Sequence, residues 1–407
     1  MTVSRRLYMD NAATSFPKPQ AVHEAMMRFA TELGASPGRG AYAEAREAGE
    51  KMTECRTRIC ELIGADQNKP EHVIFTLNTS DALNLAIRGV VLGDSRSQDG
   101  GGHVITTHLD HNSVLRPFNE LVKQIGIEQT RVTCSPQTGL VDPYDIRKAI
   151  RSNTKLIAIV HGSNVTGTLQ PIREVGRIAR ECGIPFAVDA AQTIGHYPID
   201  VETDFIDLLA FPGHKGLLGP LGTGGLYIRP GLESKMATVR EGGTGSVSED
   251  DTQPIFLPDR FEPGSHNAIG ILGLSEGVKW ILGQGVEKLW AHEQDLIRAF
   301  IGAIDEGEMP GLKLFGPQGV RDRCGVFSVR VEGFDQPQAL SDVLEQEFGI
   351  LTRSGLYCAP LAHKTFGTFD AGGMTRFSVG PFHTVHDVRY VVDALGQICM
   401  KHASARV

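Results

Sequence analysis

The sequence lacks the features that mark membrane, secreted and nucleic-acid-binding proteins. No apolar run approaches the roughly 20 residues of a membrane-spanning helix. The seven cysteines are scattered, without the paired spacing of a zinc site or a disulfide framework. The formal net charge is -8 and Lys and Arg form no cluster. We therefore expect a cytoplasmic protein that has no metal site and binds neither a membrane nor a nucleic acid.

Internal repeats and low-complexity tracts are missing as well, and what remains is the composition of a folded α/β protein. The chain has 407 residues, of which 41% are hydrophobic and 22% charged. Single cores stop growing near about 250–300 residues, so two domains are expected. A connection rich in Pro and Gly follows residue 254. We predict a large domain over residues 21–260 and a smaller one made of residues 1–20 and 261–407.

Short apolar runs alternate with stretches of helical period through the first two thirds of the chain. This alternation is typical of βαβ units in a mostly parallel sheet. Strands are expected at 72–76, 103–107, 155–161, 185–189, 208–211 and 225–228, with helices at 81–91, 114–125 and 172–181. The second part predicts a helix over 268–303, strands at 325–331 and 375–379, and a helix over 385–401. Ligands gather beyond the carboxyl ends of such strands.

The clearest chemical signal comes from two strand ends. In AVDAAQTIG, Asp189 closes one apolar run, and in LLAFPGHKG, Lys215 follows another. Pyridoxal 5'-phosphate (PLP) requires such a pair, because a lysine amine binds the aldehyde and a carboxylate keeps the pyridine nitrogen protonated. The alternative is a surface lysine with a capping aspartate, but glycines flank Lys215 and leave room for a flat ligand. We predict PLP held as a Schiff base on Lys215.

Three further strand ends carry polar residues that suit the same cofactor. Thr79 and Ser80 lie in FTLNTSDALNLA, where a strand turns into a helix and offers hydroxyl and N–H donors to a phosphate. His111, in LDHNSV, could stack on the ring and shuttle protons. Asn164, in IVHGSNVTGT, could reach the ring oxygen or the substrate. Each signal is weak alone, and their order relative to Asp189 and Lys215 gives them weight.

Together these segments resemble the cysteine desulfurases among the class V aminotransferase-fold enzymes, and the Suf-type branch more than the Nif/Isc-type. The resemblance implies a fold-type I PLP enzyme, with a large domain built on a mostly parallel seven-stranded sheet and a smaller α+β C-terminal domain. It also implies a homodimer with its active site at the subunit interface. The motifs that carry it are YMDNAATSFPKP, NTSDALNLA, DHNSV, HGSNVTGT, VDAAQTIGH, GHKGLLGPLGTGGLYI, RFEPGSHN, RSGLYCAPLAHK and TRFSVGPFHT.

The resemblance also assigns roles to individual residues. Lys215 would carry the cofactor, Asp189 would hold the pyridine nitrogen, and His111 would stack on the ring. Arg376 would clamp the substrate carboxylate in bidentate fashion, assisted by Arg353. The remaining cofactor ligands would be Asn164 and Gln192 at the ring oxygen, and Thr79, Ser80, His214 and, from the neighbouring subunit, Ser265 at the phosphate.

Cys358, in RSGLYCAP, matches the nucleophile of the desulfurases. The chemistry needs a thiolate that swings to the substrate sulfur, which suits a mobile, Gly-bounded loop with Arg353 nearby. The implied reaction converts L-cysteine to L-alanine and leaves the sulfur on Cys358 as a persulfide. A sulfur-acceptor protein would then receive it, as in iron–sulfur cluster assembly. The alternative is an inert loop thiol.

Three other functions stay open from the sequence. A selenocysteine lyase would use the same residues on L-selenocysteine, another class V enzyme would need PLP but not Cys358, and a sulfur-scaffold or interaction protein would need neither. The chain also departs from the family pattern. Pro212 stands before GHK, where many relatives have Ser or Thr, so one phosphate donor is missing. His363 and Lys364 have no derived role and are expected at the surface.

Overall fold

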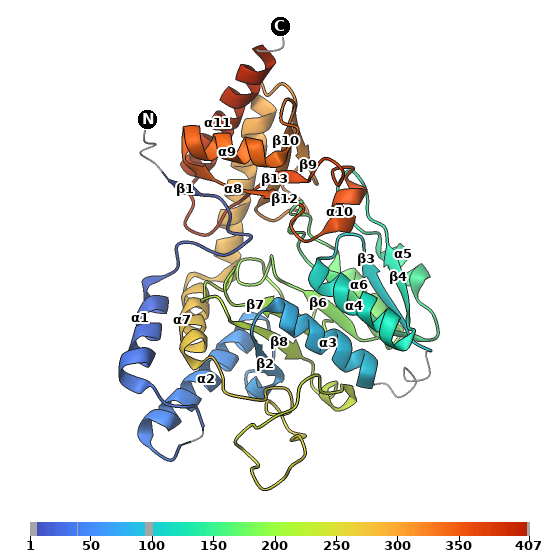
Figure 1. The fold of residues 1–407 in the computed structure, drawn as a ribbon, viewed down its shortest axis with the longest axis vertical. Coiled ribbons are helices and arrows are strands. Elements are labelled where there is room, and N and C mark those ends of the chain that lie inside the picture. The colour runs from blue at the N-terminus through green and yellow to red at the C-terminus, as the bar shows by residue number, and fades with distance from the viewer. Residues whose placement is uncertain (1–5, 39, 94–100, 405–407) are drawn as a thin grey trace.

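The computed structural model describes residues 6–38, 40–93 and 101–404. Its largest element is a seven-stranded sheet in the lower half of the molecule (Figure 1). Only β8 runs antiparallel to its neighbours, β2 and β7. The mostly parallel seven-stranded sheet is therefore confirmed. In spatial order its strands are β2 (Val73–Thr76), β8 (Gly224–Ile228), β7 (Leu208–Pro212), β6 (Phe186–Asp189), β5 (Thr154–Val160), β3 (His103–Thr107) and β4 (Glu128–Val132).

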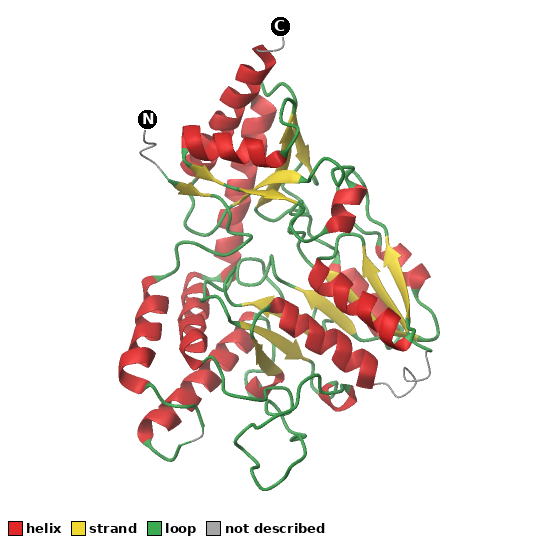
Figure 2. Cartoon of the chain, viewed as in Figure 1, coloured by secondary structure: helices red, strands yellow, loops and turns green. Residues whose placement is uncertain are grey.

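Helices cover both faces of this sheet (Figure 2). Side chains alternate between faces along each strand, so Val73 and Phe75 join one hydrophobic core while Ile74 joins the other. The first core includes residues of α2 (Ala43–Leu62), α6 (Ile172–Glu181) and α7 (Ala268–Gln284), and the second includes α3 (Thr79–Gly93) and α4 (Asn112–Ile125). Burial on both faces explains why the central strands read as continuous apolar runs.

The upper part of the molecule is a separate α+β unit with its own core. A four-stranded antiparallel sheet has the order β12 (Arg353–Gly355), β13 (Met374–Ser378), β10 (Val326–Val331) and β9 (Leu312–Phe315). Helices α8 (Val286–Glu306), α9 (Pro337–Phe348) and α11 (Val385–Ser404) contribute to its core. The strand β1 (Leu7–Tyr8) pairs in parallel with β11 (Ile350–Leu351), which brings the N-terminal segment to this unit.

The predicted domain boundary stays a prediction, and the separate core of the upper unit supports a division near it. Helix α7 departs from the predicted assignment, because its apolar residues share the core of the large sheet. The helix expected over 268–303 is also divided in two, since Gly285, at φ 85°, separates α7 from α8. The shorter helices are α1 (Gln20–Arg28), α5 (Pro143–Ala149) and α10 (Pro360–Thr365).

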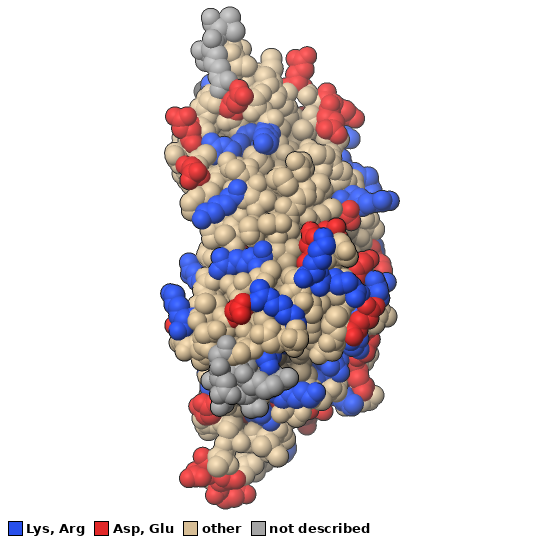
Figure 3. All heavy atoms as spheres, turned by 90° about the vertical axis from the view of Figure 1, so that its right-hand side faces the viewer, with Lys and Arg blue, Asp and Glu red and all other residues tan. Residues whose placement is uncertain are grey.

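The surface carries charges of both signs. Figure 3 shows Lys and Arg interspersed with Asp and Glu over the face that it presents. Five cysteines are buried, whereas Cys182 and Cys358 are exposed, and all seven are free thiols. Among the described residues, every helix falls short of the length and apolar character that crossing a bilayer requires.

Candidate active site

The polar residues that follow the strands meet in one cleft at the carboxyl edge of the large sheet. Strand β2 runs in the same direction as β7, because both are antiparallel to β8. The cleft has a volume of about 520 Å³. Asn78 and Ser113 line it too, although the sequence did not single them out. Of the predicted residues, the cleft brings together Thr79, Ser80, His111, Asn164, Asp189, Gln192, His214 and Lys215.

Asp189 is buried and Lys215 is half-buried at this cleft, and the loss of contact with water favours the neutral form of each. The pKa of the Lys215 amine is lowered to about 8, first by burial and then by the charge of Arg376. Burial raises the pKa of the Asp189 carboxyl, while a hydrogen bond from the Ala191 N–H and the charge of Lys215 lower it. The Ala191 nitrogen lies 2.9 Å from Asp189 Oδ1. A cation near Asp189 therefore keeps its carboxylate ionised.

The backbone just before Lys215 is held by the N-terminal segment. The carbonyl oxygen of His214 accepts hydrogen bonds from Thr14 Oγ1 (3.1 Å), from Ser15 N (3.0 Å) and Oγ (3.1 Å), and from Lys18 Nζ (3.2 Å). Burial lowers the pKa of Lys18 to about 8. The position of Lys215 thus depends on residues about 200 positions earlier.

Helix α3 points its N-terminus into one end of the cleft. Asn78 caps the helix, since its Oδ1 accepts from the Asp81 N–H at 3.0 Å. Ser80 Oγ lies 2.6 Å from Ser113 Oγ. His214 is also there, and the pKa of its imidazole is lowered to about 4 by burial and the Lys215 charge. N–H groups, hydroxyls and a neutral imidazole are suitable donors for a phosphate.

His111 is held as a neutral imidazole at the start of α4. Its Nδ1 accepts from the Ser113 N–H at 3.1 Å and lies 2.9 Å from Ser113 Oγ. Burial, followed by the charge of Lys215, lowers the pKa of His111 to about 4. Because Nδ1 is the acceptor, the single proton of the neutral ring is carried by Nε2.

The two predicted amide ligands each donate one hydrogen bond to a neighbouring backbone carbonyl. Asn164 Nδ2 donates to the Tyr357 carbonyl at 2.7 Å, and Gln192 Nε2 donates to the Ala12 carbonyl at 3.0 Å. The Oδ1 atom of Asn164 is buried and has no hydrogen-bond partner among the described residues. The Oδ1 atom of Asn164 is thus available at the cleft, and the role of Asn164 toward the ring oxygen or the substrate stays a prediction.

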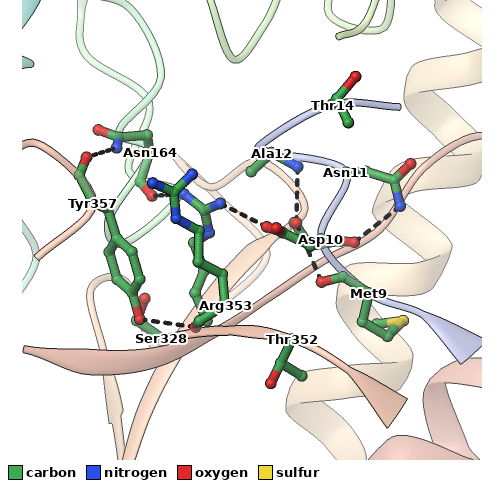
Figure 4. A network of polar contacts seen from close by, with 12 residues as sticks. Met9, Asp10, Asn11, Ala12, Thr14, Asn164, Ser328, Thr352, Arg353 and Tyr357 are labelled. Atoms are coloured by element: carbon green, nitrogen blue, oxygen red, sulfur yellow. Dashed lines mark hydrogen bonds and ion pairs between the residues drawn. The ribbon is translucent and has the colours of Figure 1, made fainter. Parts of the chain in front are cut away.

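The two predicted substrate arginines lie directly opposite each other on β12 and β13. Arg376 is only 1% exposed, and it donates from Nη1 to the Asn164 carbonyl at 2.9 Å and from Nη2 to Asp10 Oδ1 at 2.7 Å. Figure 4 shows Asp10, Asn164, Arg353 and Tyr357 converging on this region. Asp10 was missed as a functional residue, although it lies in the motif YMDNAATS that carried the family resemblance.

Cys358 is exposed and lies on a tight turn that is anchored at the cleft. Tyr357 and Cys358 both adopt left-handed backbone conformations, with φ of 47° and 59°. The Cys358 carbonyl accepts from the Asn112 N–H at 2.8 Å, next to His111. The Tyr357 hydroxyl donates to the Met374 carbonyl, and its ring centre lies 4.8 Å from the Arg376 guanidinium. Backbone and side-chain contacts therefore anchor this turn beside the cleft, and its mobility stays a prediction.

Ser265 and His363 lie away from the cleft. Ser265 lines a separate pocket with Thr76, Thr223 and Asn267, so its role toward a neighbouring subunit stays a prediction. His363 was expected at the surface and is instead fully buried, with Nδ1 2.9 Å from Thr368 Oγ1. His363 is buried because it lies on the inward-facing side of α10, about one helical turn after the Cys358 turn.

The chain belongs to the class-V aminotransferase family, whose profile matches residues 7–391. A probable cysteine desulfurase of Methanothermobacter thermautotrophicus is 33% identical over 96% of this chain and 94% of its own length. The cysteine desulfurase IscS of Dictyoglomus turgidum is 31% identical over 98% of this chain and 96% of its own. The apo structure of the cysteine desulfurase of Thermococcus onnurineus has a TM-score of 0.89 at 32% identity, covering 97% of this chain and 95% of that one.

Enzymes of this family depend on PLP, and the residues present fit that cofactor. Two buried polar atoms at the cleft, His214 Nδ1 and Asn164 Oδ1, lack a hydrogen-bond partner within the part of the chain that the structure describes. A phosphate and a ring hydroxyl supply partners of the right kind. The buried carboxylate of Asp189 likewise requires a cation, which a protonated pyridine provides.

Proposed function

We propose that this protein is a PLP-dependent cysteine desulfurase that converts L-cysteine to L-alanine and takes the sulfur onto Cys358. The observation that carries the proposal is an exposed thiol on an anchored turn, next to the cleft that brings Lys215 and Asp189 together. The relatives named as cysteine desulfurases agree with it.

The cofactor would be held at three points. Lys215 would bind it covalently, Asp189 would keep a proton on the pyridine nitrogen, and the N-terminal turn of α3, with Thr79, Ser80 and His214, would hold the phosphate. Bound PLP supplies an electron sink that acidifies the Cα–H of an attached amino acid.

Lys215 is the proton acceptor in this proposal. A pKa of about 8 leaves a useful fraction of the amine unprotonated near neutral pH, so Nζ can take the Cα proton of the substrate. His111, neutral and with its proton on Nε2, donates a hydrogen bond across the cleft. Arg353 and Arg376 orient the substrate through its carboxylate.

Sulfur transfer is assigned to Cys358. Its thiolate attacks the substrate sulfur, so an S–S bond forms as the Cβ–S bond breaks. The electron pair of the broken bond stays on Cβ, which takes the thiol proton of the substrate and becomes the methyl group of alanine, while the Lys215 amine returns to Cα the proton that it removed. The persulfide left on Cys358 then passes its outer sulfur to an acceptor thiol.

We further propose that the enzyme is a cytoplasmic homodimer that delivers sulfur to an acceptor protein. Ser265 and Thr223 line a pocket beside the cleft strand β2, where a hydroxyl could serve the phosphate of a neighbouring subunit. The exposure of Cys358 leaves the persulfide accessible to a partner.

Mass spectrometry after incubation with L-cysteine tests the proposal. We expect a mass increase of about 32 Da, one sulfur atom, on Cys358 together with released alanine. Cys358→Ser should lose both while still binding PLP. Cys182→Ser removes the other exposed thiol and is the matched control, which should behave like the wild type. Undiminished alanine release by Cys358→Ser would refute the assignment.

A further inference from the structure

Arg353 and Arg376 place two positive charges on the same face of neighbouring strands. They are direct partners in the antiparallel register of β12 and β13, where side chains approach closely and like charges destabilise the sheet. The charges of both guanidinium groups affect the same two side chains, since each lowers the pKa of Lys215 and of His111. The pair therefore needs a negative counter-charge even before a substrate arrives.

Asp10 supplies that counter-charge from the other end of the chain. Its carboxylate lies 2.7 Å from Arg376 Nη2, and its side chain remains 19% exposed while that of Arg376 is 1% exposed. The backbone around Asp10 is fixed to β13, because Asp10 bridges to Ser378 and the Ala12 N–H donates to Ser378 Oγ at 2.8 Å. The aspartate is thus built into the site and cannot leave it without breaking these contacts.

The guanidinium of Arg376 is not fully hydrogen-bonded. Its Nη1 and Nη2 are engaged, but Nε is buried without a hydrogen-bond partner among the residues that the structure describes. With two guanidinium charges and one carboxylate, the site has one positive charge unmatched. A free amino acid such as cysteine brings one α-carboxylate, which matches it.

We propose that Asp10 is a specificity-determining residue that sets the charge of the substrate-carboxylate site. By neutralising one of the two arginines, it leaves a site that accepts a singly charged carboxylate and discriminates against dianions. The inference rests on the proposed function, in which these arginines bind the substrate carboxylate, and it adds a reason for substrate choice that the arginines alone do not provide.

Anion binding to the PLP-loaded enzyme tests the proposal, with the phosphate site already filled by the cofactor. Sulfate and acetate are titrated by calorimetry into the wild type and into Asp10→Asn, which keeps the shape and an acceptor oxygen. Coulomb energy scales with ligand charge, so loss of the Asp10 charge should tighten sulfate binding about tenfold and acetate binding only about threefold. Equal factors for the two anions, or no change in either, would overturn the proposal.

Glu345→Gln is the charge-matched control. It removes one carboxylate from an exposed ion pair with Arg6, 3.0 Å away, in the same part of the molecule. Both anion affinities should stay as in the wild type. A sulfate gain in this control equal to that in Asp10→Asn would assign the effect to overall charge and refute a local role.

Arg353→Gln gives a second test that does not depend on the folding of Asp10→Asn. It leaves one arginine against one aspartate, so acetate affinity should fall about tenfold. The double variant Asp10→Asn, Arg353→Gln restores one unmatched charge and should bind acetate about threefold more tightly than Arg353→Gln alone. Unchanged acetate affinity in Arg353→Gln would overturn the proposal. Calorimetry reads the charge of the site without turnover, whereas failure of the proposed function would appear separately, as a wild type that forms no persulfide.

Discussion

Lys215 and Asp189 face the same problem, which is a charge taken out of water. Burial lowers the pKa of the amine to about 8 and raises that of the carboxyl. A cation beside Asp189 and an uncharged amine at Lys215 resolve both at once. At this scale, the chemistry of the cleft follows from the low polarity around a few groups, more than from any direct ion pair between them.

The Lys215 pKa predicts the pH dependence of turnover. The amine must be unprotonated to accept the Cα proton, so kcat should fall as the pH drops through about 8. Arg353→Gln removes a charge that lowers this pKa, so the fall should move to higher pH. A pH–rate profile on both proteins measures the shift. A shift toward lower pH in the variant would contradict the assignment of Lys215 as the base.

The residues at strand ends could be predicted from the sequence, and those brought in by distant pairing could not. Asp189, His111 and Lys215 follow apolar runs, and parallel strands end at one edge of a sheet. Asp10 reaches Arg376 across 366 positions through β1, a strand of two residues with no periodic pattern. The anchoring of the Cys358 turn by Asn112 and Asn164 likewise depends on contacts that leave no local signal.

Among the elements, α3 links fold stability to cofactor binding through its N-cap. Asn78→Ala removes the acceptor for the Asp81 N–H, which should cost about 1 kcal/mol of unfolding free energy. The first turn of α3 would also loosen where the phosphate is expected, so PLP should dissociate faster. Denaturant unfolding and the rate of PLP loss measure the two effects.

Asp142 offers the matched control for this prediction. It caps α5, where its Oδ1 accepts from the Tyr144 N–H at 2.8 Å, and it does not line the cleft. Asp142→Ala should lose a similar amount of stability and leave PLP dissociation unchanged. If both variants release PLP equally fast, the cap of α3 has no specific part in holding the phosphate.

Elements were predicted well where they are buried on both sides and poorly at the edges. The expected strand at 103–107 coincides with β3, whereas β4 was missed because its residues, EQTRV, are mostly polar and partly exposed at the sheet edge. The division of the long helix at Gly285 was also missed, since other glycines, such as Gly277 and Gly283, lie within the helix itself and a glycine in a helical pattern is tolerated. The helix ends there because α7 packs under the large sheet while α8 belongs to the upper unit.

The whole molecule should lose stability in mild acid. Unfolded histidines take up protons near pH 6.5, but the buried ones in the native state resist protonation, so the unfolded state binds more protons as the pH falls from about 6.5 to about 4. The buried histidines with a lowered pKa outnumber the buried groups whose pKa is raised and which would stabilise the protein as the pH falls. Those groups are Asp110, Asp189 and His196. Burial lowers the pKa most at His103, His111, His161, His214 and His363.

Thermal unfolding measures this effect directly. The Tm should decline steadily from about pH 7 to about pH 5, a range in which most carboxylates stay ionised. His363→Gln, which removes a buried histidine outside the cleft, should flatten the decline in part. A Tm that stays constant or rises over this range would show that the histidines are protonated in the native state.

The contact between Asp10 and Arg376 has a consequence for how the enzyme is made. When the ribosome has synthesised the central sheet, the nascent chain already contains Lys215 and Asp189. The site for the substrate carboxylate also needs Arg376 on β13, which is synthesised much later. Translation that stops before β13 therefore yields a chain without this pocket. Asp10 is synthesised first and Arg376 near the end, so the carboxylate site can form only when synthesis is almost complete.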